Sequence, residues 1–176
     1  MKRVYSISLL ISFFILSLSS NIYGQKTIDE FGKIIFKAFK NDSIDNICKL
    51  TPSTIQLQRF LDSLGIDKSS LSISNLDKMK EEQNLQLRKL CENIHKDTLR
   101  YNLSWSRATF VKVKFEERKG TLGTSNAKGK VITFTTAKLY FDSNNNHYIL
   151  DLCDISKHDD SWKLGSGNLK LSIINE

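Results

Sequence analysis

The amino-acid sequence predicts an α+β protein in which amino-terminal helices pack on a curved four-stranded antiparallel meander. Up to about Ile94, apolar residues recur at the spacing of amphipathic helices. Beyond about Leu103 they alternate with polar residues, and short polar turns separate the runs. Helices and strands are thus segregated along the chain, unlike the alternating order of a parallel βαβ sheet.

The amino terminus has the composition of a secretory signal peptide, which we place at residues 1–24. Two basic residues, Lys2 and Arg3, precede an uncharged, largely apolar run over 4–18, and Gly24 offers the peptidase a small residue. An uncleaved membrane anchor is the alternative. However, about 15 apolar residues rise only about 22 Å as a helix, short of a hydrocarbon core of about 30 Å. We therefore expect cleavage after Gly24.

The mature chain is expected to be a single α+β domain over residues 25–176, exported to the periplasm or secreted, with no membrane span. Removing Lys2 and Arg3 lowers the formal net charge from +7 to +5. Export removes nucleic acid as the usual partner of basic residues, so we interpret the loose basic cluster as a solvated hairpin face. An anionic envelope surface remains an alternative partner. The cluster comprises Lys112, Lys114, Arg118, Lys119, Lys128 and Lys130.

The first mature helix is predicted over residues 28–40, because Thr27 and Glu30 have the spacing of a capping box and an apolar stripe follows. The polar segment 41–43 then recaps the chain for a short second helix. That helix carries Ile44, Ile47 and Cys48 on one side.

A third helix is predicted after Thr51, as the N-cap, and Pro52, at the first helical position, and it ends at Gly65. The serine-rich segment 67–75 is typical of a surface loop. A long helix is predicted over 76–95, with a core-facing stripe. Its stripe consists of Leu76, Met79, Gln83, Leu87, Leu90, Cys91 and Ile94.

Three cysteines, Cys48, Cys91 and Cys153, would enter an oxidising compartment on export. Because Cys48 and Cys91 lie on apolar helix stripes, we expect either one disulfide between them or three buried thiols. Their spacing fits no zinc-ligand pattern, so no metal or cofactor is expected.

Four strands are predicted, over about residues 103–116, 130–141, 148–156 and 161–173. If the turn 142–147 closes a hairpin, Lys138 lies opposite Asp151, Tyr140 opposite Ile149 and Phe134 opposite Ile155. If the turn 157–160 closes the next hairpin, Asp154 lies opposite Lys163, Ile155 opposite Trp162 and Cys153 opposite Leu164.

This register makes both faces of the predicted sheet apolar. One face carries Phe134, Ile155 and Trp162, with Cys153 and Leu164 beside them; the other carries Ala137, Leu139, Phe141, Tyr148, Leu150, Leu152 and Leu169. A partner subunit, such as a second copy in a homodimer, a pocket or the helices must then cover the second face. Gly165 and Gly167 indicate a bulge, a bend or a close approach in the last strand. The candidate binding residues are Phe134, Tyr140, Ile149, Ile155 and Trp162.

Leading helices followed by a curved meander, whose last strand opens with Trp162-Lys163-Leu164, resemble the cystatin-like and nuclear-transport-factor-two-like α+β folds over about residues 27–174. The Gln-x-Val-x-Gly wedge of cystatin-type protease inhibitors is absent from the sequence, so the resemblance does not imply protease inhibition. Proteins of the folds that the chain resembles include enzymes, small-molecule binders and dimerisation modules, so the resemblance implies no single activity.

Asp151 is the candidate catalytic acid, because it shares a strand face with apolar neighbours. In the predicted register, Lys138 faces it, and we interpret the two as a cross-strand ion pair. The segment 142–146 matches the oxygen-rich start of a calcium loop, but it lacks the glycine and the late carboxylate, so we interpret it as a hairpin turn.

Two further groups of reactive residues are weak candidates for catalysis. The sequence His158-Asp159-Asp160 falls at a predicted hairpin tip, which we interpret as a solvated turn. Cys91 and His95 are one helical turn apart, but no orienting third group accompanies them.

The sequence therefore favours an exported, non-enzymatic domain that binds a protein or a small apolar ligand. The alternative is a small hydrolase or isomerase that uses Asp151 in the concavity of the sheet. A deep pocket at Asp151 without a lysine partner would favour the enzyme.

Overall fold

The computed structural model describes residues 27–63, 73–121, 131–165 and 169–174. The predicted signal peptide over 1–24, the helix end at Gly65 and the predicted role of Gly167 lie outside these residues. Helices come first: α2 (Ile28–Lys40), α3 (Ile44–Cys48), α4 (Thr54–Ser63), α5 (Ile73–Lys96) and the 3-10 helix η2 (Trp105–Arg107). Strands follow: β1 (Thr109–Thr121), β2 (Val131–Ser143), β3 (Asn146–His158), β4 (Ser161–Leu164) and β5 (Leu169–Ile174). This order confirms the α+β class.

All the pairings in the sheet are antiparallel, in the order β1-β2-β3-β4, and β5 pairs with β3 as well. The predicted last strand over 161–173 is therefore two strands, which occupy successive stretches of the same edge of β3. The break lies at Gly165, whose N–H donates to the Asp154 carbonyl over 2.7 Å. The first strand also starts later than predicted, because Leu103 and Trp105 are buried in the preceding turn and η2.

The first predicted hairpin is confirmed over most of its length. Asn144 and Asn145 both have positive φ angles, as a two-residue hairpin turn requires. Lys138 faces Asp151 and Tyr140 faces Ile149. A register shift then follows, so Ile155 faces Thr135 and not the predicted Phe134.

The second predicted hairpin is wrong by two residues. We expected a four-residue turn over 157–160, but only Asp159 and Asp160 form the turn, both with positive φ. The observed pairs are Ile155 with Leu164, Ser156 with Lys163, Lys157 with Trp162 and His158 with Ser161.

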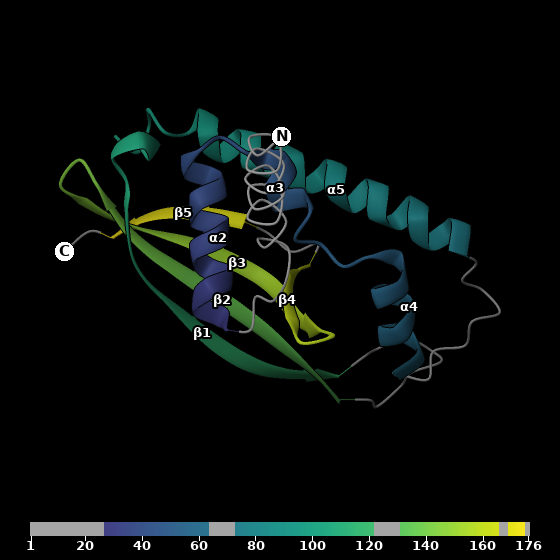
Figure 1. Cartoon of the computed structure of the whole chain (residues 1–176). Coiled ribbons are helices and arrows are strands. Elements are labelled where there is room, and N and C mark those ends of the chain that lie inside the picture. The colour runs from purple at the N-terminus through teal and green to yellow at the C-terminus, as the bar shows by residue number, and fades with distance from the viewer. Residues whose placement is uncertain (1–26, 64–72, 122–130, 166–168, 175–176) are drawn as a thin grey trace, which may run out of the picture.

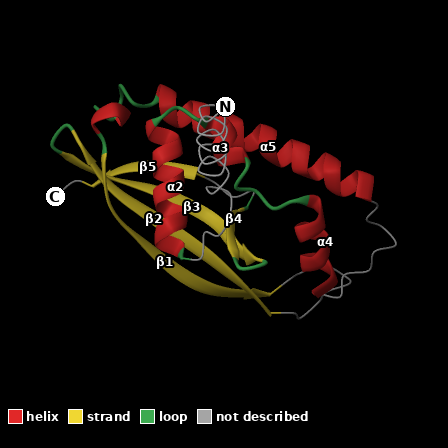
Figure 2. Ribbon diagram, viewed as in Figure 1, coloured by secondary structure: helices red, strands yellow, loops and turns green. Residues whose placement is uncertain are grey.

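The helices and the strongly curved sheet enclose one apolar core (Figures 1 and 2). Phe36 from α2 and Trp105 pack on Phe141, which stacks on Tyr148 at 5.3 Å between ring centroids. Asp154 has a φ of 57°, and next to this irregularity Ile155 turns into the same core, with 1% of its surface exposed. The predicted apolar row of Ile155 and Trp162 with Leu164 on a separate face of the sheet is therefore wrong. Ile155 and Leu164 instead lie in the same core as Leu139, Phe141 and Tyr148.

Helix starts follow local capping. The box at Thr27 and Glu30 is present as predicted. For α4 the predicted N-cap Thr51 is wrong: Ser53 and Gln56 exchange side-chain and backbone hydrogen bonds instead. The Thr51 hydroxyl is buried and donates to the Cys48 carbonyl over 2.8 Å, which terminates α3.

Candidate functional site

One face of the sheet turns away from the helices, and we call it the open face. Alternation places it: Ala137, Leu139 and Phe141 are buried in the core, so Lys138 and Tyr140 between them point the other way. Within the described residues, no helix is packed over this side. By the same alternation and register, its central members are Lys112, Lys114, Lys138, Tyr140, Ile149, Asp151 and Lys170.

Tyr140 lies at the centre of the basic part of the open face. The ammonium groups of Lys112 and Lys114 lie 5.4 and 5.6 Å from the centroid of its ring. Both lysines come from β1: Lys112 lies directly opposite Tyr140, and Lys114 lies opposite Lys138, two residues away on the same face. This arrangement concentrates positive charge around an aromatic side chain.

Asp151 also lies on the open face and not in a helix-covered concavity. Lys138 on β2 and Lys170 on β5 are its two cross-strand partners. Among the described residues, neither lysine comes within ion-pair distance of its carboxylate. The predicted ion pair of Lys138 with Asp151 is therefore not formed, although the two residues face each other. An Asp151 enzyme would also need a deep pocket around the acid, and Asp151 instead lies on the side of the sheet that points away from the core.

The five predicted binding residues do not form one site. Ile155 is in the core, and Trp162 is partly buried against it. Tyr140 and Ile149 lie on the open face as cross-strand partners. Phe134 lies in β2 opposite Arg118, but its side chain is outside what the structure describes.

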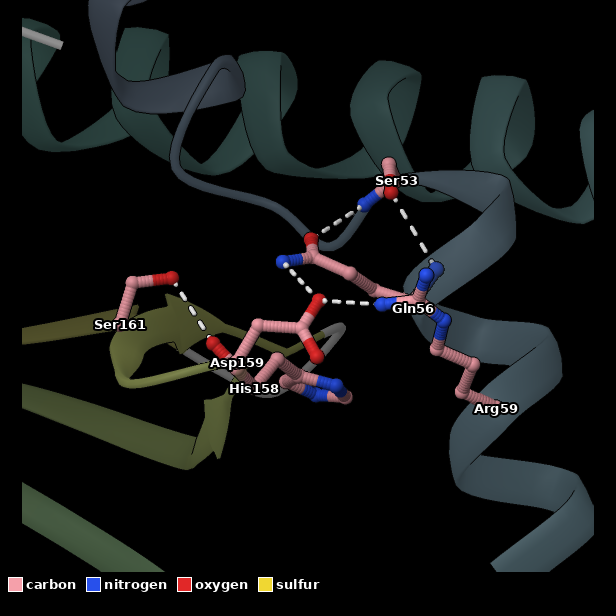
Figure 3. Close-up of polar contacts among 6 residues, drawn as sticks. All are labelled: Ser53, Gln56, Arg59, His158, Asp159 and Ser161. Atoms are coloured by element: carbon pink, nitrogen blue, oxygen red, sulfur yellow. Dashed lines mark hydrogen bonds and ion pairs between the residues drawn. The ribbon is translucent and has the colours of Figure 1, made fainter. Parts of the chain in front are cut away.

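A second cluster forms where the β3–β4 hairpin meets α4 and α5, and we call it the hairpin site. Figure 3 shows its α4 side, where His158, Asp159 and Ser161 of the hairpin lie beside Gln56 and Arg59. It comprises Ser156, His158 and Lys163 on the hairpin, with the neighbouring side chains of α4 and α5. His158 is only 8% exposed, which corrects its interpretation as part of a solvated turn. Its Nε2 lies 2.8 Å from Ser156 Oγ, and the Phe60 ring meets its ring edge-on at 5.6 Å between centroids.

Burial dominates the electrostatics of His158. It lowers the pKa of the imidazole, since the charged form loses solvation. The carboxylate of Asp159 opposes this effect and the charge of Lys163 adds to it, while a backbone hydrogen bond with Gln56 favours the charged ring. The imidazole is therefore neutral near pH 7.

Asp159 at the hairpin tip joins the hairpin to α4. Arg59 donates to Asp159 Oδ2 over 3.1 Å, and Gln56 Nε2 reaches the same oxygen at 3.5 Å (Figure 3). The ion pair is exposed on both sides, so it contributes at most about 1 kcal/mol. Within the turn, the Ser161 hydroxyl donates to the His158 carbonyl over 2.9 Å.

Lys163 lies directly opposite Ser156 in the hairpin, half-buried. Burial lowers the pKa of its ammonium, the charge of Lys80 on α5 lowers it further, and Asp159 opposes both. Next to it, Gln83 on α5 donates weakly to the Leu164 carbonyl at 3.5 Å. Two lysines from different elements thus approach each other here.

The buried thiols are not arranged for nucleophilic chemistry. Cys48 and Cys91 are both buried and unbridged, and burial raises the pKa of Cys91 to about 12. His95, one turn further along α5, stacks on Phe39, and its Nε2 lies 3.4 Å from Asp42 Oδ1 without hydrogen-bond geometry. A neutral thiol beside this ring is a core residue.

The segment 142–146 forms the turn of the first hairpin. Its Asp142 carboxylate contacts His147 Nδ1 at 2.7 Å. In the described part of the chain, no group of histidine, cysteine and acidic residues is arranged to hold a metal ion. In that same part, no helix is both long and apolar enough to cross a membrane.

The hairpin site was missed because of the register. The alternation Ser156-x-His158 and Ser161-x-Lys163 indicates four polar residues on one face, provided that the two strands pair around a two-residue turn. The four-residue turn that we assumed moves His158 into the loop.

Comparison of the chain with protein-family models, with curated proteins and with solved structures finds no match.

Proposed function

We propose that the chain is exported after removal of residues 1–24, and that it is a non-enzymatic binding domain whose open face docks an acidic surface of a partner protein. The observation that carries this proposal is the position of Tyr140 under the ammonium groups of Lys112 and Lys114, on a sheet face that none of the described helices covers. We also propose that the fold is related to the cystatin-like and nuclear-transport-factor-two-like folds. This part of the proposal is supported only by the sequence of elements, helices first and an antiparallel meander after them.

Charge complementarity supports an acidic partner. Among the described residues, no ion pair involves Lys112, Lys114, Lys138 or Lys170. Asp151 is the carboxylate at the centre of the face, and the register also places Glu116, two residues after Lys114, on the same side. Acidic side chains of a partner would complete these charges, steer the encounter and leave Tyr140 as the aromatic anchor.

The strand β1 extends the same surface. It pairs with β2 on one side, and no backbone hydrogen bond on its other side appears among the described residues. Val111, at the bulge, and Phe115, opposite Ala137 on the other side of the sheet, are each about half exposed along this edge strand. An edge of this kind offers backbone groups to an incoming extended segment.

The other occupants that we considered find less support. A small apolar ligand needs a cavity under the helices, where Leu139, Leu150 and Leu152 are fully buried in a continuous core. An enzyme that uses Asp151 needs a shielded acid, and Asp151 lies on the open face between two lysines.

Site-specific photo-crosslinking tests the docking proposal. A benzophenone side chain at Ile149, next to Tyr140, should yield a discrete adduct in a native envelope extract. Lys112→Glu with Lys114→Glu should reduce the adduct at least tenfold, because both positive charges at Tyr140 then become negative, and added salt should weaken the adduct as well.

The matched control for crosslinking is Lys33→Glu with Lys37→Glu, the same charge change on an exposed side of α2. That variant should crosslink like the natural chain. Equal loss in both double variants would refute docking at the open face. An adduct with the mass of two copies of the chain would replace the acidic partner by a homodimer.

Export is tested separately by intact-mass measurement of the protein recovered from the envelope fraction. The expected mass begins at Gln25. A mass that includes Met1 to Gly24 would contradict cleavage.

A further inference from the structure

We propose that the hairpin site binds an oxyanion group, a phosphate or a carboxylate, between Lys163 on the β3–β4 hairpin and Lys80 on α5, beside the Ser156–His158 pair. The proposal goes beyond the function proposed above and uses none of the residues of the open face.

The hairpin supplies one polar face to this site. Ser156 pairs with Lys163, and His158 pairs with Ser161, so the four side chains lie on the same side of a short two-stranded ribbon. Phe60 and Gln56 show that this side faces α4, and Gln83 ties the end of β4 to α5. The hairpin, α4 and α5 therefore meet at this side of the ribbon, on which Lys163 lies.

The charges at this site are unbalanced. Lys80 lies one helical turn before Gln83 on α5, and Gln83 contacts the Leu164 carbonyl next to Lys163, so the two lysines lie on adjoining elements. Burial and the charge of Lys80 both lower the pKa of Lys163. Asp159 is the acid near them, and its carboxylate already accepts hydrogen bonds from Arg59 and Gln56. Among the described residues, neither lysine has an ion-pair partner. An anion between the two ammonium groups would remove their repulsion and restore the solvation that Lys163 has lost.

The Ser156–His158 pair can adapt to such an anion. With a neutral ring that donates to the backbone of Gln56, Nε2 accepts the Ser156 hydroxyl proton over 2.8 Å. When the ring gains a proton, Nε2 donates to Ser156 Oγ, and the Ser156 hydroxyl, which keeps its proton, turns to donate a hydrogen bond to the anion. Anion binding and protonation of His158 then favour each other, with Asp159 and Arg59, Lys163 and Lys80 as the charged groups around the ring.

Titration of the purified mature chain with inorganic phosphate and, separately, with acetate tests the proposal, followed by amide NMR shifts in chloride buffer. We expect saturable shifts at Ser156, His158 and Lys163, with affinity at least threefold higher at pH 6 than at pH 8. Lys163→Met should weaken binding at least tenfold, and Lys80→Met should act in the same direction. Saturation by phosphate alone assigns a phosphate ligand, whereas comparable saturation by acetate assigns a carboxylate ligand.

Lys89→Met, on an exposed side of the same helix α5, is the matched control and should bind like the natural chain. Retained amide dispersion in each variant shows that it is folded. Shifts that never saturate, that spread over surface lysines, or that persist in folded Lys163→Met would overturn the site.

Discussion

The helices α2 and α4 are held to the rest of the molecule in different ways. Six residues of α2 are buried, whereas none of α4 is. Three phenylalanines attach α2 to the sheet through non-directional apolar contact. Polar contacts attach α4: Thr54 to Asp77, and Arg59 to Asp159. Apolar burial stabilises by about 25 cal/mol per Å², whereas each exposed polar contact contributes about 1 kcal/mol or less.

The difference shows where the molecule can respond to a ligand. Local opening requires little free energy where few apolar contacts are lost, so the α4 end should open far more readily than the α2 end. The hairpin site lies at the α4 end. Binding there would cost little reorganisation of the core.

The largest expected effect on stability comes from replacing one phenylalanine by alanine in the core at α2 and, separately, one on α4. Phe141→Ala removes a ring that packs against Phe36, Trp105 and Tyr148, and it should lower the free energy of unfolding by about 3–5 kcal/mol. Phe60→Ala on α4 should lower it by about 1 kcal/mol or less, because its ring is partly exposed. Urea unfolding of both variants measures this. Similar losses would contradict the contrast.

A smaller effect is expected from two glycines. An added Cβ at Gly165 would meet the Asp154 carbonyl oxygen at 2.1 Å, so Gly165→Ala should destabilise by about 1–3 kcal/mol. Gly32→Ala on α2 meets only the Val113 side chain, at 3.2 Å, and gains helix propensity of about 1 kcal/mol, which offsets the crowding. Denaturant midpoints of the two variants should therefore differ. A neutral Gly165→Ala would show that β4 and β5 do not break as described.

The smallest expected effect concerns pH at the α4 end. Because burial lowers the pKa of His158 below its ordinary value of about 6.5, the unfolded chain binds the proton more tightly than the folded one. Stability from this residue is complete above pH 6.5 and declines as the pH falls through 6.5 towards the folded pKa. Urea unfolding at pH 8 and pH 5 should show a larger decline for the natural chain than for His158→Gln. An equal decline would contradict a buried ring.

The two hairpins show how much of the fold the sequence could predict. An asparagine-rich segment with polar flanks predicted the first turn, and its register followed from side-chain alternation. In the second, Asp159 and Asp160 adopt positive φ, which aspartate tolerates, but the polar segment 157–160 fitted a four-residue turn as well as a two-residue one. The irregular backbone at Asp154 could not be predicted from the sequence either, because it accompanies the close approach of Gly165 to the Asp154 carbonyl.

The sites were harder to predict than the fold for the same reason. Lys138 and Asp151 face each other as predicted, since their hairpin is regular. The approach of Lys80 to Lys163 depends on how α5 lies against β4, a tertiary contact that residue spacing does not encode. Ile155 became a predicted binding residue only because a regular strand would have left it on the second face.

The burial of Cys91 limits when the chain could be oxidised. Because burial raises the pKa of Cys91 to about 12, the residue is a neutral thiol near pH 7, and the thiolate is the form that reacts. Thiol–disulfide exchange in the packed protein would be correspondingly slow. A disulfide between Cys48 and Cys91 would therefore have to form before the packing of α3 and α5 buries the two thiols. The number of free thiols in the mature protein consequently records whether oxidation or folding came first.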